Sequence, residues 1–316
     1  MVGDARKKRH ARFSFAAARR FAPDFCLNTR HTVFEFEARR DSIAKARDGS
    51  MYVMQAGGET RRRSTIAGVA IDALSFDEVV DAVIAHAAAG GSPAYVVTPN
   101  AHHVVLLQKD ELLRAVYAGA FLVVPDGVPL LWGTALLGAP LPSRVNGTDL
   151  FETLCARAAR DGLRVFLLGG RPGAATAAAK RLSARDPALQ VCGIYCPPFG
   201  FERDALESAN ILAQIRAARP HLLFVGLGAP KQEYWMYRNC AAAGVPVSLG
   251  IGVSFELVGG VVARAPRWMQ RAGLEWLYRL GTEPKRLWRR YVFGNAAFSF
   301  LLARQFAAQR IFRRRT

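Results

Sequence analysis

The sequence of 316 residues is 51% hydrophobic and carries a formal net charge of +18 at pH 7. This hydrophobic content indicates a globular protein and excludes a chain that is disordered throughout, and no stretch reaches the roughly 20 apolar residues that a membrane-spanning helix needs. The five cysteines are scattered and odd in number, which is typical of a reduced cytoplasmic protein and of one without a paired-cysteine metal site.

The positive charge lies at the two ends of the chain. Residues 1–63 contain 15 Lys and Arg against 7 Asp and Glu, and residues 264–316 contain 13 against 2. Residues 64–263 are nearly neutral, with 15 basic and 16 acidic residues. We therefore expect three parts: a basic, disordered extension, a folded core and a basic, aromatic-rich appendage. Such flanks favour an anionic partner, which is a nucleic acid, an acidic membrane surface or a phosphorylated ligand.

Within the core, short apolar runs alternate with segments of helical period. A capping box at residues 75–78 opens the first helix. We expect strands at residues 66–71, 94–98, 121–124, 165–168, 189–194, 222–225 and 247–251, and helices from 75 and over 103–117, 148–160, 173–184, 204–218 and 230–243. Continuous apolar strands separated by helices predict an α/β fold, a doubly wound and mostly parallel sheet with helices on both faces.

Polar and glycine-rich loops follow several of these strands. In a doubly wound sheet, ligands bind outside the carboxyl ends of the strands, so these loops are predicted to form the site. Asp126 follows the strand at residues 121–124 and precedes a glycine. It is either a turn residue or a reactive carboxylate, and its local sequence allows both interpretations. The loops are TPN (98–100), PDG (125–127), GGRPG (169–173), GLGAPKQE (226–233) and GIGVS (250–254).

No cofactor or metal ion is predicted. The glycine loops at 169–173 and 226–233 match neither a dinucleotide fingerprint nor a Walker A loop, and each either binds a phosphate or packs a strand tightly against a helix. His102 and His103 are adjacent and point about 100° apart on a helix, which favours a packing role over a metal site. The core contains no Asp-x-Asp motif that would hold Mg²⁺ on a diphosphate.

Arginines and aromatic residues interleave along residues 264–291. Side chains in such a pattern have three possible functions: they stack on nucleic-acid bases, lie in a membrane interface or bind phosphates. Arg286 and Arg289 share one helical face, and Pro284 separates them from Arg279. Beyond residue 293, the remaining tail is predicted to form an interfacial amphipathic helix.

The motifs together resemble the WecG/TagA/CpsF glycosyltransferases of bacterial surface polysaccharide synthesis. The resemblance covers roughly residues 65–293. It rests on TPN (98–100), PDG (125–127), RVNGTDL (144–150), GAPKQEYW (228–235), RAP (264–266) and EWLYRL (275–280).

This resemblance implies an inverting, metal-independent transferase that moves a sugar from a UDP-sugar to a polyprenyl-diphosphate-linked acceptor sugar. The sugar is N-acetylmannosamine-like or another hexose. Asp126 is then the catalytic base. The implied substrate-binding residues are Thr98, Asn100, Arg144, Gln232, Arg279, Arg286 and Arg289. The sequence departs from the family at Glu256, where an aspartate is common, so no role is assigned to this carboxylate.

The expected location is the inner face of the cytoplasmic membrane. There the basic protein is expected to attach peripherally to the anionic lipid surface. No nucleic acid is expected as a partner, and a homo-oligomer is left open. Two alternatives remain. A basic nucleic-acid-binding α/β protein would account for the charged flanks but not for the neutral core, and a nicotinamide-dependent oxidoreductase lacks its glycine fingerprint.

Overall fold

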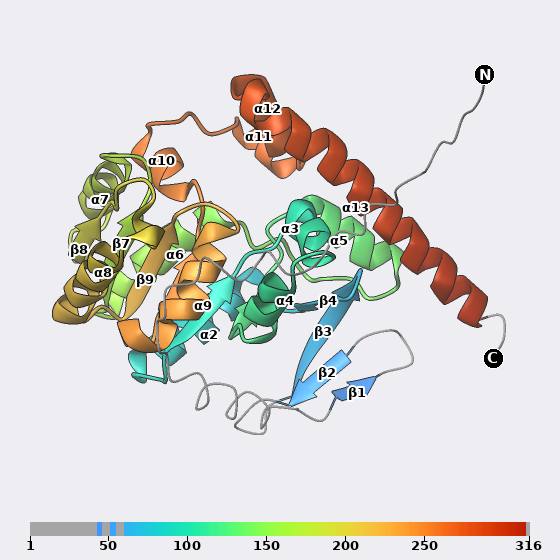
Figure 1. Ribbon diagram of the computed structural model, residues 1–316, viewed down its shortest axis with the longest axis horizontal. Coiled ribbons are helices and arrows are strands. Elements are labelled where there is room, and N and C mark those ends of the chain that lie inside the picture. Colours follow the sequence, from blue (N-terminus) through green and yellow to red (C-terminus); the bar gives the residue numbers. More distant parts are fainter. Residues whose placement is uncertain (1–42, 46–50, 55–59, 314–316) are drawn as a thin grey trace, which may run out of the picture. The chain divides into compact units, whose positions relative to one another are not determined.

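Six parallel strands form the main sheet of the computed structural model (Figure 1). The structure describes residues 43–45, 51–54 and 60–313, which belong to one compact unit. The strands lie in the order β6-β5-β10-β9-β7-β8. They are β5 (Ala94–Val97), β6 (Leu122–Val123), β7 (Arg164–Gly169), β8 (Gln190–Tyr195), β9 (Leu222–Gly226) and β10 (Val247–Gly250). The predicted parallel α/β sheet is confirmed.

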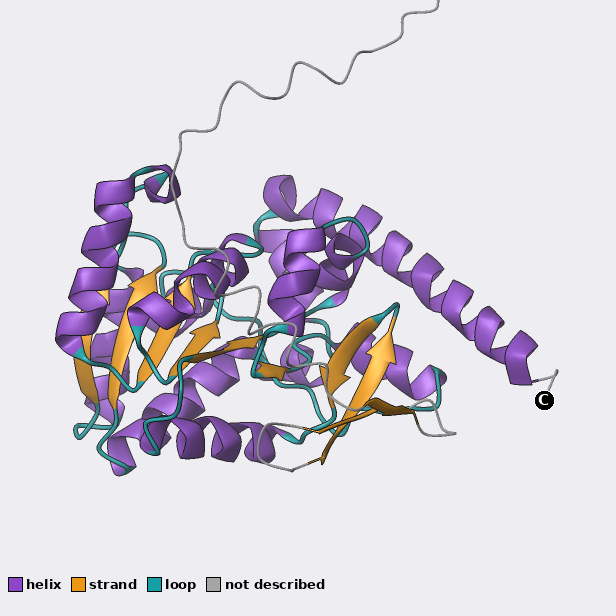
Figure 2. Cartoon of the chain, turned by 60° about the horizontal axis from the view of Figure 1, so that its bottom comes forward, coloured by secondary structure: helices purple, strands orange, loops and turns teal. Residues whose placement is uncertain are grey.

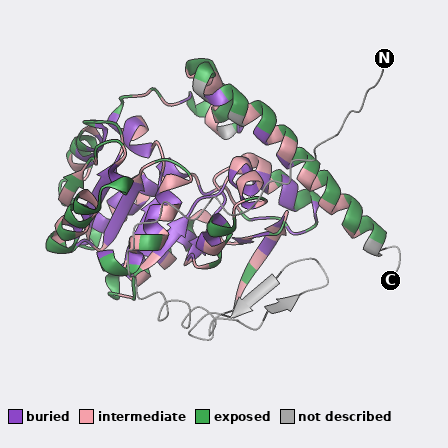
Figure 3. Cartoon of the chain, in the orientation of Figure 1, coloured by how far each residue is buried: buried purple, intermediate pink, exposed green. Residues whose placement is uncertain are grey.

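Helices cover both faces of this sheet (Figure 2). Successive strand residues point to opposite faces, so Leu222 and Phe224 join one hydrophobic cluster while Leu223 and Val225 join the other. Apart from the edge strand β8, the strands are almost entirely buried (Figure 3), which explains their uninterrupted apolar sequences. One cluster includes α2 (Phe76–Ala88), α6 (Gly147–Arg160), α7 (Ala174–Arg185) and α10 (Ser254–Gly259); the other includes α3 (Ala101–Leu107), α4 (Glu111–Ala118), α5 (Val128–Leu136), α8 (Ala205–Ala218) and α9 (Lys231–Ala243).

Two predicted elements differ in detail from the structure. The strand expected at 66–71 is interrupted at its start by a hairpin turn, because Ala67 and Gly68 both have positive φ (48° and 80°) and reverse the chain; residues 69–71 are a strand as predicted. The helix expected at 103–117 is divided at Asp110, whose carboxylate accepts a hydrogen bond from Leu113 N and caps α4. A short 3₁₀ helix, η1 (Phe201–Arg203), precedes α8.

A second, antiparallel sheet has the order β1-β2-β3-β4. Its strands are β1 (Ile43–Lys45), β2 (Met51–Met54), β3 (Thr60–Ile66) and β4 (Val69–Asp72). The predicted boundary between residues 63 and 64 falls within β3. Most of the extension predicted at 1–63, including all residues before 43, lies outside the described residues.

Asp72 joins the two sheets. One of its carboxylate oxygens accepts a hydrogen bond from the backbone N–H of Val123 in β6 at 2.7 Å, and the other pairs with Arg63 Nε, also at 2.7 Å. Asp72 is completely buried. Its carboxylate therefore satisfies a backbone donor at the edge of the main sheet, on the strand that leads directly to Asp126.

Three helices follow in the part of the chain that the structure describes: α11 (Arg267–Arg271), α12 (Glu275–Thr282) and α13 (Pro284–Arg313). One face of α13 packs on the core through Leu287 and Phe298, which are buried. Gln305 accepts a hydrogen bond from Ala67 N and donates one to Thr65 O, which ties α13 to the β3–β4 hairpin. The tail predicted to be interfacial beyond residue 293 is thus helical but partly embedded, and Phe300, at 68% exposure, lies on its outer face.

None of the helices that the structure describes has the length and apolar character needed to cross a membrane.

Replacing Asp72 with alanine should lower the free energy of unfolding by about 3–5 kcal/mol, because the partly buried Arg63 loses its counter-ion and Val123 N loses its acceptor. Urea denaturation measures the change. Asp161→Ala, at an exposed position, is the control and should change the value by less than about 0.5 kcal/mol. Equal stability of the two variants would contradict this account of Asp72.

Candidate active site

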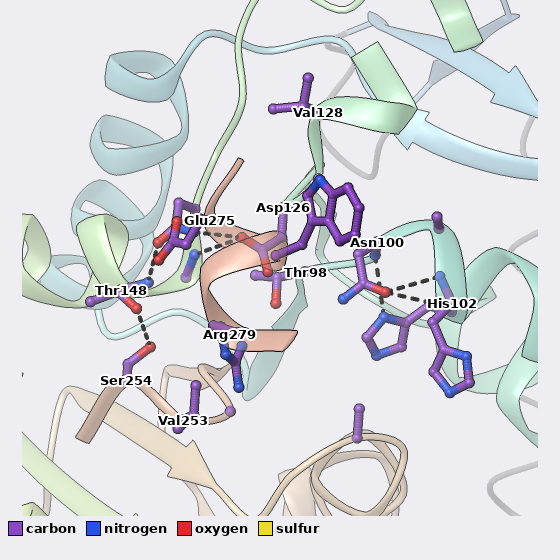
Figure 4. Close-up of a pocket in the computed structure, with 18 of the residues that line it drawn as sticks. Thr98, Asn100, His102, Asp126, Val128, Thr148, Val253, Ser254, Glu275 and Arg279 are labelled. Carbon is purple, nitrogen blue, oxygen red and sulfur yellow. Dashed lines mark hydrogen bonds between the residues drawn. The ribbon is translucent and has the colours of Figure 1, made fainter. Parts of the chain in front are cut away.

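A cavity of about 420 Å³ opens at the carboxyl ends of β5, β6 and β10. Its walls come from distant parts of the sequence, and α12 and α13 contribute one side of it. Of the eight candidate residues predicted from the sequence, six line this cavity: Thr98, Asn100, Asp126, Arg144, Gln232 and Arg279. Figure 4 shows the Asp126 carboxylate near its centre, between Glu275 and Asn100, with Thr98 and Arg279 nearby.

The backbone fixes the position of Asp126. Its N–H donates to Pro99 O at 2.8 Å, and Pro125 O accepts from Val145 N at 2.7 Å. The residue is therefore held between the loop after β5 and the loop before α6. A Cβ atom on the following Gly127 would lie 3.3 Å from Cβ of Asn100, so this glycine permits close packing of the two loops that carry Asp126 and Asn100.

The Asp126 carboxylate accepts two hydrogen bonds on one oxygen, from Asn146 Nδ2 at 3.0 Å and from Gly147 N at 3.3 Å. Although part of the residue faces the cavity, the carboxylate lies deep in the protein. Poor hydration raises the pKa of Asp126 to about 7, and the Glu275 charge adds to this effect. Arg144, the Gly147 hydrogen bond and Arg279 oppose it. Asp126 is thus poised to exchange a proton near neutral pH.

Asn146 holds this arrangement in place. Its side-chain oxygen caps α6 by accepting from Thr148 N and Asp149 N, while its amide nitrogen donates to Asp126. Both ends of the side-chain amide are therefore engaged. The positive end of the α6 dipole also faces the carboxylate through Gly147 N.

Arg144 and Glu275 form an ion pair beside Asp126, with a separation of 3.3 Å. Arg264 lies 3.5 Å from the other Glu275 oxygen and 2.7 Å from Asp149. Because Glu275 belongs to α12 and Arg144 precedes α6, this network attaches the C-terminal helices to the rim of the cavity.

Thr98 and Asn100 occupy the loop after β5. Thr98 is buried and its hydroxyl donates to Gly250 O at 3.1 Å, which joins the ends of β5 and β10. The Asn100 side-chain oxygen caps α3 by accepting from His102 N and His103 N. His103 Nδ1 accepts from Asn100 N at 3.2 Å, and the histidine lies 3.7 Å from Glu233. The two histidines both line the cavity.

Gln232 is buried and braces the loop after β10. Its side-chain oxygen accepts from Gly252 N at 3.0 Å, and its amide nitrogen donates to Glu233 Oε1 at 2.9 Å. Gln232 therefore lines the cavity and also holds the loop after β10 in place.

The three arginines predicted in the appendage are not equivalent. Arg279 lines the cavity, and within the part of the chain that the structure describes no ion pair includes it. Arg289 is exposed, does not line the cavity, and lies over the Trp288 ring at 5.5 Å. The side chain of Arg286 lies outside the described part of the structure, so its predicted role stays a prediction.

The glycine loop after β7 packs closely against its neighbours at its first two glycines. Its residues do not line the cavity. A Cβ atom at Gly169 would lie 2.8 Å from Gly226 O, and Gly169 has a φ of 100°. Glu256 accepts a hydrogen bond from Arg171 N at 2.9 Å and holds this loop, which gives that carboxylate a structural position away from the cavity.

Several cavity residues were not singled out from the sequence. Asn146 and Gly147 lie within a quoted motif, and the signal was an Asn-Gly pair at the start of a helix, where a cap is expected. Glu275, Trp276, Tyr291 and Asn295 come from α12 and α13. The acidic Glu275, alone among basic neighbours, was the signal for the ion-pair network.

Asp126→Asn should stabilise the fold at pH 8. An aspartate whose pKa rises from 3.8 to about 7 on folding disfavours the folded state above pH 4, and the penalty is complete above pH 7. The isosteric amide avoids this penalty, so urea denaturation should show a gain of about 2–4 kcal/mol at pH 8 and none below about pH 4.

The control for this measurement is Asp161→Asn at an exposed position. Its free energy of unfolding should differ from that of the wild type by the same small amount at pH 8 and below about pH 4. Lower stability of Asp126→Asn at pH 8 would contradict the raised pKa.

Comparison with known proteins identifies the family. The model of the glycosyl transferase WecG/TagA/CpsF family matches residues 64–312. Over 197 residues the chain is 34% identical to N-acetylglucosaminyldiphosphoundecaprenol N-acetyl-beta-D-mannosaminyltransferase of Bacillus spizizenii (strain ATCC 23059 / NRRL B-14472 / W23), a match that covers 62% of this chain and 74% of that enzyme. The enzyme of the same name from Bacillus subtilis (strain 168) is 32% identical with the same coverage. The family expected from the motifs is confirmed: the chain belongs to the WecG/TagA/CpsF glycosyltransferases.

Proposed function

We propose that this glycosyltransferase moves an N-acetylmannosamine-like sugar from a UDP-sugar to an acceptor sugar linked to a polyprenyl diphosphate. The observation that carries the proposal is the Asp126 carboxylate, with a pKa of about 7, in a cavity that also presents Arg144 and Arg279. The relatives' names supply the sugar and the acceptor class.

Asp126 acts as the general base. A sugar hydroxyl has a pKa far above 7, so its attack on an anomeric carbon requires a base within hydrogen-bond reach. A carboxylate with a pKa near 7 accepts a proton far more readily than one near 4. Only one oxygen of Asp126 is occupied by the hydrogen bonds from Asn146 and Gly147. The other oxygen is available for the acceptor hydroxyl.

The reaction is a single displacement. The acceptor oxygen forms a bond to the anomeric carbon, its proton passes to Asp126, and the bond between that carbon and the donor phosphate breaks with its electron pair leaving on UDP. Attack opposite the leaving group inverts the anomeric configuration. The other carboxylate that lines the cavity, Glu275, is held by Arg144 and Arg264 and is therefore poorly placed to act as a second nucleophile.

Arginine guanidinium groups stabilise the departing UDP. Arg279 already lies in the cavity, and a planar guanidinium binds phosphate oxygens through two parallel hydrogen bonds. Arg286 and Arg289 follow in the sequence of the next helix; Arg289 does not line the cavity in this structure, and the predicted part of both in binding the diphosphate stays a prediction. This arrangement assigns to arginines the charge neutralisation that a metal ion supplies elsewhere, so the reaction is proposed to be metal-independent.

The protein is proposed to work on the cytoplasmic face of the membrane, attached peripherally. The outer face of α13 exposes Trp288, Phe293 and Phe300 beside Arg289. Exposed aromatic and basic side chains on one helix suit an anionic lipid interface. Family membership and a cavity lined mostly by the neutral core disfavour the nucleic-acid-binding alternative.

Asp126→Asn should lower kcat by about 10²–10⁴-fold, the usual contribution of a general base, while UDP binds as tightly as in the wild type. UDP release measures the rate, and calorimetry measures the binding. Asp161→Asn serves as the control at an exposed carboxylate. Near wild-type turnover in Asp126→Asn would remove this residue as the base.

The rate should rise with pH and level off above about 7, because only ionised Asp126 accepts the proton. Glu275→Gln removes a negative charge that raises the pKa of Asp126 and frees Arg144 to lower it. The midpoint of the kcat/KM profile should therefore shift to lower pH. Glu111→Gln, an exposed charge on α4, should leave it in place. A shift to higher pH in Glu275→Gln would contradict the assignment.

A further inference from the structure

We propose that a second hollow, beside α11, binds the diphosphate of the lipid-linked acceptor. This hollow has a volume of about 310 Å³ and is lined by Arg144, Asp149, Arg267 and Gln270; we call it the α11 hollow. The inference rests on the proposed function and assigns one of its substrate groups to a place outside the main cavity.

Arg144 connects the two spaces, because it lines both the main cavity and the α11 hollow. The acceptor hydroxyl has to reach Asp126 in the main cavity. The acceptor diphosphate is attached to the anomeric carbon of the same sugar, so it lies about one sugar ring away from Asp126. Because the α11 hollow shares the Arg144 wall with the main cavity, it borders the space that the acceptor sugar would occupy.

The charges of the α11 hollow suit an anion. Asp149 is neutralised by Arg264 at 2.7 Å, and Arg144 is paired with Glu275 at 3.3 Å. Among the ion pairs of residues 60–313, none includes Arg267, which is exposed. Arg267 therefore leaves an uncompensated positive charge in the hollow, with a guanidinium group able to bind two phosphate oxygens at once.

A separate cation for each substrate solves an electrostatic problem. Donor and acceptor both carry a diphosphate, and the two groups repel each other when they are bound together. Arg279 lines the main cavity but not the α11 hollow, whereas Arg267 lines the hollow but not the main cavity. Arg279 is thus assigned to the donor and Arg267 to the acceptor, with Arg144 between them.

The surroundings of Arg267 also suit a lipid chain. The next residue, Trp268, is 64% exposed, and Leu277 on α12 is 45% exposed. Exposed apolar side chains on the helix that carries Arg267 and on the next helix suit a prenyl chain that leaves the diphosphate toward the membrane.

Binding of farnesyl diphosphate tests the site without catalysis. Calorimetry is carried out with UDP at saturation, so that the donor position is filled. Wild-type protein should bind farnesyl diphosphate, and Arg267→Gln should bind it at least about tenfold more weakly. Inorganic pyrophosphate should bind more weakly but with the same dependence on Arg267. Wild-type protein that does not bind, or equal binding by the variant, would overturn the proposal.

The matched control is Arg160→Gln. Arg160 is also exposed and at a helix end, about 20 Å along α6 from the end that faces the cavity. The Arg160→Gln variant should bind farnesyl diphosphate as tightly as the wild type does. Melting temperatures of the three proteins verify that each is folded. If Arg267→Gln does not fold, competition in the wild type decides: farnesyl diphosphate should compete with the acceptor and not with the UDP-sugar.

Kinetic measurements show whether Arg267 binds the acceptor phosphate or whether its replacement lowers activity in general. With a prenyl-diphosphate-linked N-acetylglucosamine, Arg267→Gln should raise the acceptor KM about tenfold and leave the UDP-sugar KM unchanged. With an alkyl glycoside of N-acetylglucosamine, which lacks phosphate, the variant and the wild type should have the same acceptor KM. A rise in the donor KM, or an equal loss with both acceptors, would place Arg267 elsewhere. A wild type that transfers no sugar refutes the proposed function, whereas the calorimetric result still decides the diphosphate site.

Discussion

Burial of one carboxylate, that of Asp126, imposes most of the local structure around the cavity. The carboxylate is poorly hydrated, and its pKa is raised to about 7 for that reason. An ionised group in such a place is tolerated only when backbone and side-chain donors hold it, and here Asn146 and Gly147 do so. The neighbouring strands β5 and β6 bury apolar residues almost completely. The free energy gained by this burial offsets the free-energy cost of burying the Asp126 carboxylate.

The C-terminal helices complete the site with charge. The core alone supplies Asp126 and the loops that fix it, whereas Glu275 and Arg279 come from α12. Glu275 holds Arg144 and Arg264, and its negative charge acts on Asp126. Docking of α12 therefore brings Arg279 into the cavity and also changes the pKa of Asp126.

Sequence reasoning located the sheet and much of the site for identifiable reasons. Strands such as 222–225 are apolar on both faces, and the polar loops that follow them have to meet at one edge of a parallel sheet. Thr98, Asn100 and Asp126 could be placed together in this way. Assigning Arg279 to the same site depended on the family resemblance, because no periodic pattern shows where a C-terminal helix docks.

Other features were beyond the reach of the sequence. The Asn146 side chain acts as a cap and as a donor to Asp126, and only the three-dimensional arrangement shows the second role. The glycines at 169–173 allow either phosphate binding or close packing, and only the structure shows that Gly169 packs closely against Gly226. The burial of Phe298 within an apparently interfacial tail depends on its tertiary contacts with the core.

The account depends on the ionisation of Asp126, which can be observed directly. The carboxyl carbons of aspartate are labelled with ¹³C, and the signal of Asp126 is identified by its absence in Asp126→Asn. Titration of this signal by NMR in the folded, substrate-free protein should give a pKa of about 7. A pKa near 4 would show an ordinary, well-hydrated carboxylate and would contradict the central claim.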